Sequence, residues 1–218
     1  MRGLVAYGTY VPYFRLDRKA IAAALGAPSG SGTRAVASYD EDTTSLGVEA
    51  ARAALRVAPG LRPEAVYFAT AMPAYLDKTN ATAIHAALGL DGAALACDMA
   101  GSVRSGAGAL RAALQGGGPT LVVLSDIRTG LPGGGDERAG GDGAAALLVA
   151  DDSRELPALA EPVAHASATA EFLERWRLPA EELQLGFLVK HADHAEYIMT
   201  DHRLRPFGRG EALLAGGH

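Results

Sequence analysis

The fold is decided by the stretch Asp98-Met99-Ala100-Gly101-Ser102-Val103-Arg104-Ser105-Gly106-Ala107-Gly108-Ala109-Leu110. The short apolar run at 92–97 is typical of a buried strand, and the small residues and leucines at 107–114 favour a closely packed helix. A strand is therefore expected to end in a glycine and serine turn, with a helix starting near Ser102. In an α/β protein, such a junction places backbone N–H groups at the carboxyl end of the sheet, where ligands bind.

The rest of the chain repeats this alternation of strand and helix. Strands are expected at 4–12, 65–70 and 119–126, and helices at 20–25, 46–55 and 83–88. Acidic and hydroxyl residues at 40–44 precede the second of these helices, where they can cap it and complement its dipole. The pattern predicts an α/β fold.

Composition excludes several classes of protein. The 218 residues suit one well-buried domain, and the net charge of −5 provides no basic face for nucleic acid or an anionic membrane. The apolar runs are too short to span a bilayer, and the first residues enter a strand with no secretory signal. The single cysteine excludes an internal disulfide framework. We therefore expect a cytoplasmic protein.

The central stretch resembles the thiolase superfamily, in particular 3-hydroxy-3-methylglutaryl-CoA synthases and β-ketoacyl-ACP synthases III. In that family an aspartate, four residues and the nucleophilic cysteine are followed by small residues that open a glycine-rich buried helix. With Asp98 at the family's aspartate, Val103 occupies the cysteine position. The only cysteine, Cys97, lies one residue before that aspartate. The resemblance therefore implies a site that lacks its nucleophile.

A second departure lies in the loop after the strand at 65–70. In the synthases this loop carries a glutamate that acts as general acid/base, and here Ala71 occupies its position. The spacing of the tyrosine and lysine that follow is kept at Tyr75 and Lys78. A methyl group cannot transfer a proton, so this role is empty unless another residue enters the site.

The resemblance covers roughly residues 3–179 and implies a thiolase-like half. We expect residues 1–180 to form a mixed sheet with a buried Ala/Gly-rich helix, matching only the amino-terminal half of a synthase, and 181–218 to be an unassigned tail. It also implies an acyl-CoA ligand, no other cofactor, and a place in lipid or isoprenoid metabolism. A homodimer or a partner chain is expected, and by analogy the partners include a thiolase and a zinc-ribbon/OB-fold protein.

Two functional classes follow from these residues. The first is a condensing or acyltransferase family member with impaired or absent catalysis, and the alternative is a non-catalytic thioester-binding or scaffold subunit. No catalytic residue is assigned. The candidate ligand-binding residues are Tyr75, Lys78, Ser102 and Arg104. For Arg104 two interpretations remain: it contacts the phosphates of CoA, or it caps the helix and lies in solvent.

The tail contains four of the six histidines. They are His191, His194, His202 and His218, with Asp193 and Asp201 nearby. A zinc site is one interpretation, but no cysteine supports it, and a solvated polar tail is favoured. A change of reading frame after a deletion is a third interpretation. We expect no metal.

Overall fold

The computed structural model describes residues 1–26, 30–132 and 134–170, and beyond them only the backbone of four short strands. The chain divides into two compact units. The first contains residues 1–128 and 141–165, and the second contains 129–140 and 166–218. The predicted division at residue 180 stays a prediction.

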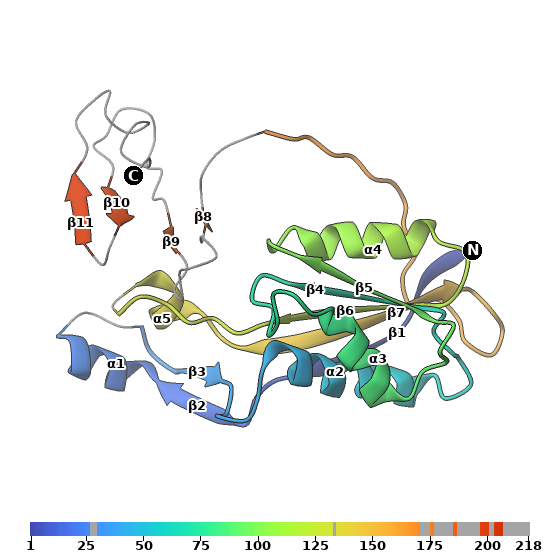
Figure 1. The fold of residues 1–218 in the computed structure, drawn as a ribbon, viewed down its shortest axis with the longest axis horizontal. Coiled ribbons are helices and arrows are strands. Elements are labelled where there is room, and N and C mark those ends of the chain that lie inside the picture. The colour runs from blue at the N-terminus through green and yellow to red at the C-terminus, as the bar shows by residue number, and fades with distance from the viewer. Residues whose placement is uncertain are drawn as a thin grey trace. The chain divides into compact units, whose positions relative to one another are not determined.

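The first unit is built on a five-stranded mixed sheet (Figure 1). In spatial order its strands are β1 (Arg2–Tyr10), β7 (Gly143–Asp151), β6 (Thr120–Asp126), β4 (Ala65–Thr70) and β5 (Leu95–Ala100). Strands β6, β4 and β5 run parallel, whereas β7 is antiparallel to both of its neighbours. The predicted mixed sheet is confirmed, and the carboxyl ends of β4, β5 and β6 meet at one edge.

Helices cover both faces of this sheet. Helices α2 (Thr43–Val57) and α3 (Asn80–Leu88) lie on one face, and α4 (Ser105–Gln115) lies on the other (Figure 1). Successive strand residues point to opposite faces. Accordingly, Leu121 and Val123 belong to the same core cluster as α2 and α3, while Val122 packs with Ala109 and Ala113 of α4.

A smaller antiparallel pair, β2 (Phe14–Asp17) and β3 (Thr33–Val36), lies beside the sheet within the same unit. Helix α1 (Arg18–Leu25) lies between them in sequence. Asp17 caps its amino end, since the Asp17 side chain accepts a hydrogen bond from the Lys19 amide. Arg34 of β3 forms a buried ion pair with Asp142, at 3.5 Å between Nη2 and Oδ1. Strand β3 is thereby fastened to the loop that precedes β7.

In the described part of the second unit, the elements are short. They are α5 (Gly135–Ala139), β8 (Arg175–Trp176), β9 (Leu185–Gly186), β10 (Tyr197–Thr200) and β11 (Arg203–Pro206). Strand β8 pairs with β9, and β10 pairs with β11, both antiparallel. The four histidines considered as metal ligands lie outside the described residues.

Two boundaries in the central stretch differ from the prediction. The strand predicted at 92–97 begins at Leu95 and runs to Ala100, because Asp91 holds a turn by accepting hydrogen bonds from the amides of Ala93 and Ala94. Helix α4 begins at Ser105, since residues 102–104 form a turn first. Burial of this helix is confined to the side that faces the sheet.

In the described part of the chain, no helix combines the length and apolar character that crossing a membrane requires.

Candidate ligand-binding site

A cavity of roughly 100 Å³ lies where β4 and β6 end and α4 begins. Most residues of its wall have small or apolar side chains. Thr70 and Ser102 contribute hydroxyl groups, and Asp126 contributes a carboxylate. The lining residues are Ala69, Thr70, Ala71, Ser102, Val103, Gly106, Leu124 and Asp126. A cavity at the carboxyl edge of the sheet agrees with the position predicted from the sequence.

The structure brings together Ala71 and Val103, the two residues expected from the sequence at the acid/base and nucleophile positions. Ala71 directly follows β4, and Val103 lies in the turn between β5 and α4, yet both line this cavity. The Val103 side chain is 62% exposed. Neither side chain can act as a nucleophile or carry a proton, so the wall between them is chemically inert at these two points.

The turn before α4 and the first turn of this helix each depend on one glycine. Gly101 has a φ of +112°, which L residues with a side chain rarely adopt. At Gly106 a Cβ atom would lie 2.7 Å from Cδ2 of Leu124, so the absence of a side chain lets the first turn of α4 approach β6. These glycines set the position of Ser102 and Val103 against the sheet.

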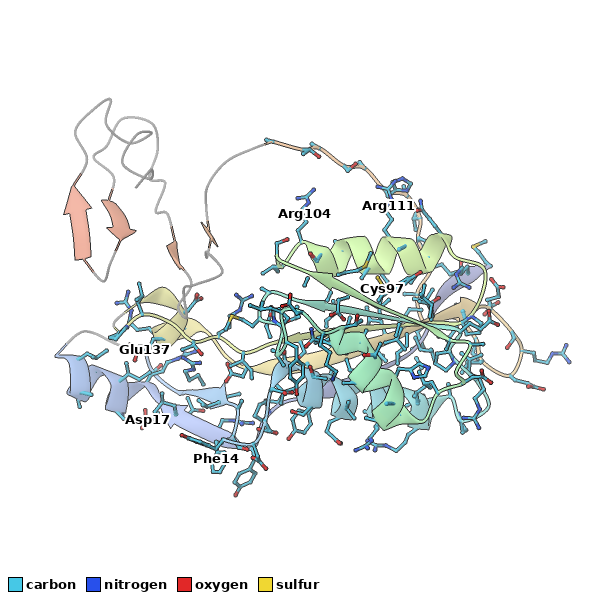
Figure 2. All side chains as sticks on the ribbon, viewed as in Figure 1. Phe14, Asp17, Cys97, Arg104, Arg111 and Glu137 are labelled. Carbon is cyan, nitrogen blue, oxygen red and sulfur yellow. The ribbon has the colours of Figure 1, made fainter. Side chains whose placement is uncertain are left out.

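The four candidate ligand-binding residues do not all reach the cavity. Ser102 lines it, whereas Tyr75 and Lys78 lie on the loop that leads away from Ala71 and are not among the lining residues. The Lys78 ammonium lies 4.5 Å from the centre of the Tyr75 ring, a cation–π contact. Arg104 is at the start of α4, and Figure 2 shows its side chain directed away from the sheet.

Asp126 is a site residue that the sequence did not suggest. It is the only carboxylate among the cavity's lining residues. Its Oδ1 accepts hydrogen bonds from the Ala71 amide at 2.8 Å and from Thr70 Oγ1 at 3.1 Å, and its Oδ2 lies 2.9 Å from Nη2 of Arg128. These donors engage both oxygens, so Asp126 holds the end of β4 rather than offering an open carboxylate.

Asp98 has a role that its place in the sequence did not reveal. Thr79, the residue before α3, makes no side-chain cap. Asp98 supplies one from the neighbouring strand, since its oxygens accept hydrogen bonds from the amides of Asn80 at 2.7 Å and Ala81 at 2.6 Å. A carboxylate at this end of a helix also complements the helix dipole. Thr79 is a residue type favoured as a helix cap, so no signal in the sequence indicates this role of Asp98.

The lone thiol is displaced from the cavity. Cys97 lies on β5 and is partly buried, with Sγ 3.6 Å from the backbone oxygen of Asp98. It is not among the residues that line the cavity. Within the described residues there is no cluster of three or more side chains suited to a metal ion.

A shallow depression of about 380 Å³ adjoins the cavity and shares Leu124 and Asp126 with it. It lies at the ends of β1 and β6 and the start of β7, and Tyr10 forms part of its wall. The Tyr10 hydroxyl donates a hydrogen bond to Glu41. This bond, together with burial and the nearby carboxylates, raises the pKa of Tyr10 above its ordinary value of 10.0.

Comparisons with known proteins agree with this geometry. No family model matches the sequence. The hydroxymethylglutaryl-CoA synthase of Aeropyrum pernix is 32% identical over 199 residues, which are 85% of this chain and 55% of that protein. The chain thus spans about half the length of the curated relatives it matches.

Solved structures show the same fold. MvaS in complex with 3-hydroxy-3-methylglutaryl coenzyme A superposes with a TM-score of 0.71 at 25% identity, over 85% of this chain and 48% of that one. The 3-oxoacyl-(acyl carrier protein) synthase III of Pseudomonas aeruginosa PAO1 gives 0.62 at 27% identity, over 71% and 51%. The chain is therefore a thiolase-like protein related to the hydroxymethylglutaryl-CoA synthases.

Proposed function

We propose that this chain is a synthase-like protein that binds a CoA thioester and has little or no condensation activity of its own. One observation carries the proposal: Ala71 and Val103 line a single cavity. The sequence resemblance assigns these two residues to the positions of the family's acid/base and nucleophile. The site therefore keeps the meeting point of β4, β6 and α4. It lacks two of the three chemical groups that the reaction uses.

The expected loss of rate follows from the chemistry. In the family's reaction a thiolate accepts the acyl group, a glutamate removes a proton, and N–H groups hold the thioester oxygen. Removal of a nucleophile leaves only the roughly 10³ to 10⁴-fold acceleration that binding and oxyanion groups provide. Asp126 does not replace the missing acid/base, because three donors already engage its carboxylate.

In this proposal the candidate ligand-binding residues contact different parts of the thioester. Ser102 lines the cavity and is suited to the acyl end of a thioester. Lys78 and Arg104 lie outside the wall and carry positive charge, which suits the phosphates of CoA. Tyr75 supports Lys78 through the cation–π contact. A solved relative holding 3-hydroxy-3-methylglutaryl coenzyme A adds support for this class of ligand.

A partner chain or a second copy forms part of the proposal. The outer side of α4 is exposed at Ala107 and Gly108, and Tyr7 of β1 is 57% exposed. Exposed apolar surface of this kind is suited to packing against another polypeptide. A thiolase and a zinc-ribbon/OB-fold protein are proposed partners by resemblance alone, as are a cytoplasmic location and a role in isoprenoid metabolism.

Calorimetry and turnover together test this function. The purified chain is titrated with acetyl-CoA and then assayed for condensation with acetoacetyl-CoA. We expect binding without measurable turnover, and we expect the double variant V103C/A71E to gain turnover because it restores both reactive groups. Turnover by the unmodified chain, or no binding of acetyl-CoA, would contradict the proposal.

A further inference from the structure

One carboxylate connects the two segments that meet at the cavity. Asp98 lies on β5, the strand that leads into the turn containing Ser102 and Val103. Its Oδ2 accepts hydrogen bonds from the amide of Asn80 at 2.7 Å and from Nδ2 of the same residue at 3.0 Å. Asn80 is the first residue of α3 and follows the loop that begins at Ala71. The contact therefore joins β5 to the end of that loop.

Asn80 in turn fixes the path of the loop. Its Oδ1 accepts a hydrogen bond from the Tyr75 amide at 3.0 Å. Its Nδ2 donates to the backbone oxygens of Tyr75 at 2.9 Å and Lys78 at 3.3 Å. One side chain thus closes the loop on itself between Tyr75 and Lys78. Because the bonds go to the backbone, they determine where both side chains are presented.

Because Asn80 is buried, its side chain needs hydrogen-bond partners from the protein. Asn80 is 1% exposed, so water cannot replace the hydrogen bonds of its amide group. Asn80 accepts the Tyr75 amide with its oxygen and uses its nitrogen as the donor to Asp98, which needs a carboxylate or another acceptor at position 98. The acceptor oxygen at position 98 and the orientation of the Asn80 amide are therefore linked.

We propose that Asp98 and Asn80 are a positioning pair that holds the 71–79 loop in its ligand-binding conformation. This inference rests on the proposed function, since it assigns the pair to the same thioester site. Asp98 performs two separable tasks: it caps α3 through the amides of Asn80 and Ala81, and it orients the Asn80 side chain. Neither residue lines the cavity, so both act through the loop.

The variant Asn80→Ala separates these two tasks. It keeps the backbone amides that Asp98 caps, and it removes every bond between the side chain and the loop. We expect the amides of residues 75–78 to exchange hydrogen at least about tenfold faster, and the Kd for acetyl-CoA to rise by a similar factor, because the three hydrogen bonds between this side chain and the loop are lost. Both quantities are measured on the full chain, by hydrogen exchange and by calorimetry.

Three further variants complete the design. Asp98→Asn leaves one acceptor oxygen in place of two, so it can keep the bond from Asn80 Nδ2 or the bond from the Ala81 amide, but not both. Asn80→Asp turns a carboxylate oxygen toward Asp98 and toward the backbone oxygens of Tyr75 and Lys78, so it is expected to expose the loop as Asn80→Ala does. Asp91→Asn is the matched control. It removes an equal charge from a turn whose bond goes to the Ala93 amide, and it should leave the loop and the Kd unchanged.

Unchanged exchange at residues 75–78 in Asn80→Ala would overturn the inference. So would faster exchange with an unchanged Kd, because the loop would then not serve the ligand. If the unmodified chain binds no acetyl-CoA, the proposed function fails, while loop exchange still decides whether Asn80 positions the loop. The two failures are therefore distinguishable.

Discussion

The wall of the cavity is largely apolar, whereas the polar framework formed by Asp98, Asp126 and Asp142 is hydrogen-bonded to neighbouring segments. The wall has methyl groups at Ala71 and Val103, where the family's pattern places reactive groups. In the framework each carboxylate has a partner: Asp126 holds the end of β4, Asp98 holds Asn80, and Asp142 holds Arg34. The backbone geometry of such a site is therefore fixed by carboxylates outside the chemistry. On the proposed function, such a site keeps its shape without its reactive side chains.

The largest effect is expected from breaking the framework at Asp142. Arg34 and Asp142 are 7% and 2% exposed at their side chains, and Asp142 also accepts the amides of Ala37 and Arg128. Asp142→Ala removes the carboxylate that neutralises a buried guanidinium, which should lower the free energy of unfolding by about 3 to 5 kcal/mol. Urea unfolding followed by circular dichroism measures this.

The exposed pair between Glu49 and Arg52 provides the control for Asp142. Its side chains are 43% and 48% exposed, with 2.6 Å between the charged atoms. Solvent screens such a pair, so Glu49→Ala should change stability by no more than about 1 kcal/mol. Equal losses of stability in Asp142→Ala and Glu49→Ala would mean that the buried ion pair contributes no more than the exposed one.

An intermediate effect is expected at the cavity wall, from two glycines of α4. Gly106→Ala places a methyl group against Leu124, whereas Gly108 has open space around it. We expect Gly106→Ala to cost about 1 to 3 kcal/mol and to weaken acetyl-CoA binding. Gly108→Ala should stabilise the helix by about 0.5 to 1 kcal/mol with no change in binding. Thermal unfolding measures the change in stability of both variants, and calorimetry measures acetyl-CoA binding. Together they separate an effect on the cavity wall from an effect on helix stability.

The smallest effect concerns Tyr10, whose hydrogen bond to Glu41 raises its pKa above 10.0. Because the folded pKa is the higher one, the stabilisation is fully present below pH 10.0 and is lost as the pH rises through the folded value. Tyr10→Phe should cost about 1 kcal/mol at pH 8. The difference from the unmodified chain should shrink in strongly alkaline solution. A constant difference would contradict this assignment.

Local sequence signals predicted the elements that have a strong pattern of their own. The strand at 65–70 coincides with β4, and the capping residues before 46–55 correspond to a capping box between Asp42 and Ser45. The alignment of Asp98 predicts that Val103 occupies the family's nucleophile position, and the loop after the strand at 65–70 predicts that Ala71 occupies its acid/base position. Both residues line one cavity, and their assignment to these positions stays a prediction.

Contacts between distant residues escaped the sequence because they leave no periodic signal. Asp98 meets Asn80 across 18 residues, and Asp126 meets Ala71 across 55. Nothing near either aspartate in the sequence identifies its partner. The same limit explains the strand start at Leu95, since the turn held by Asp91 depends on a single side-chain bond.

Intact-protein mass spectrometry of V103C and of the unmodified chain, after incubation with acetyl-CoA, tests the central claim most directly. We predict that V103C gains the mass of one acetyl group at the substituted position, and that the unmodified chain gains none. An acetyl group on Cys97 of the unmodified chain would contradict the account, because the alignment that places Val103 at the nucleophile position would then be wrong.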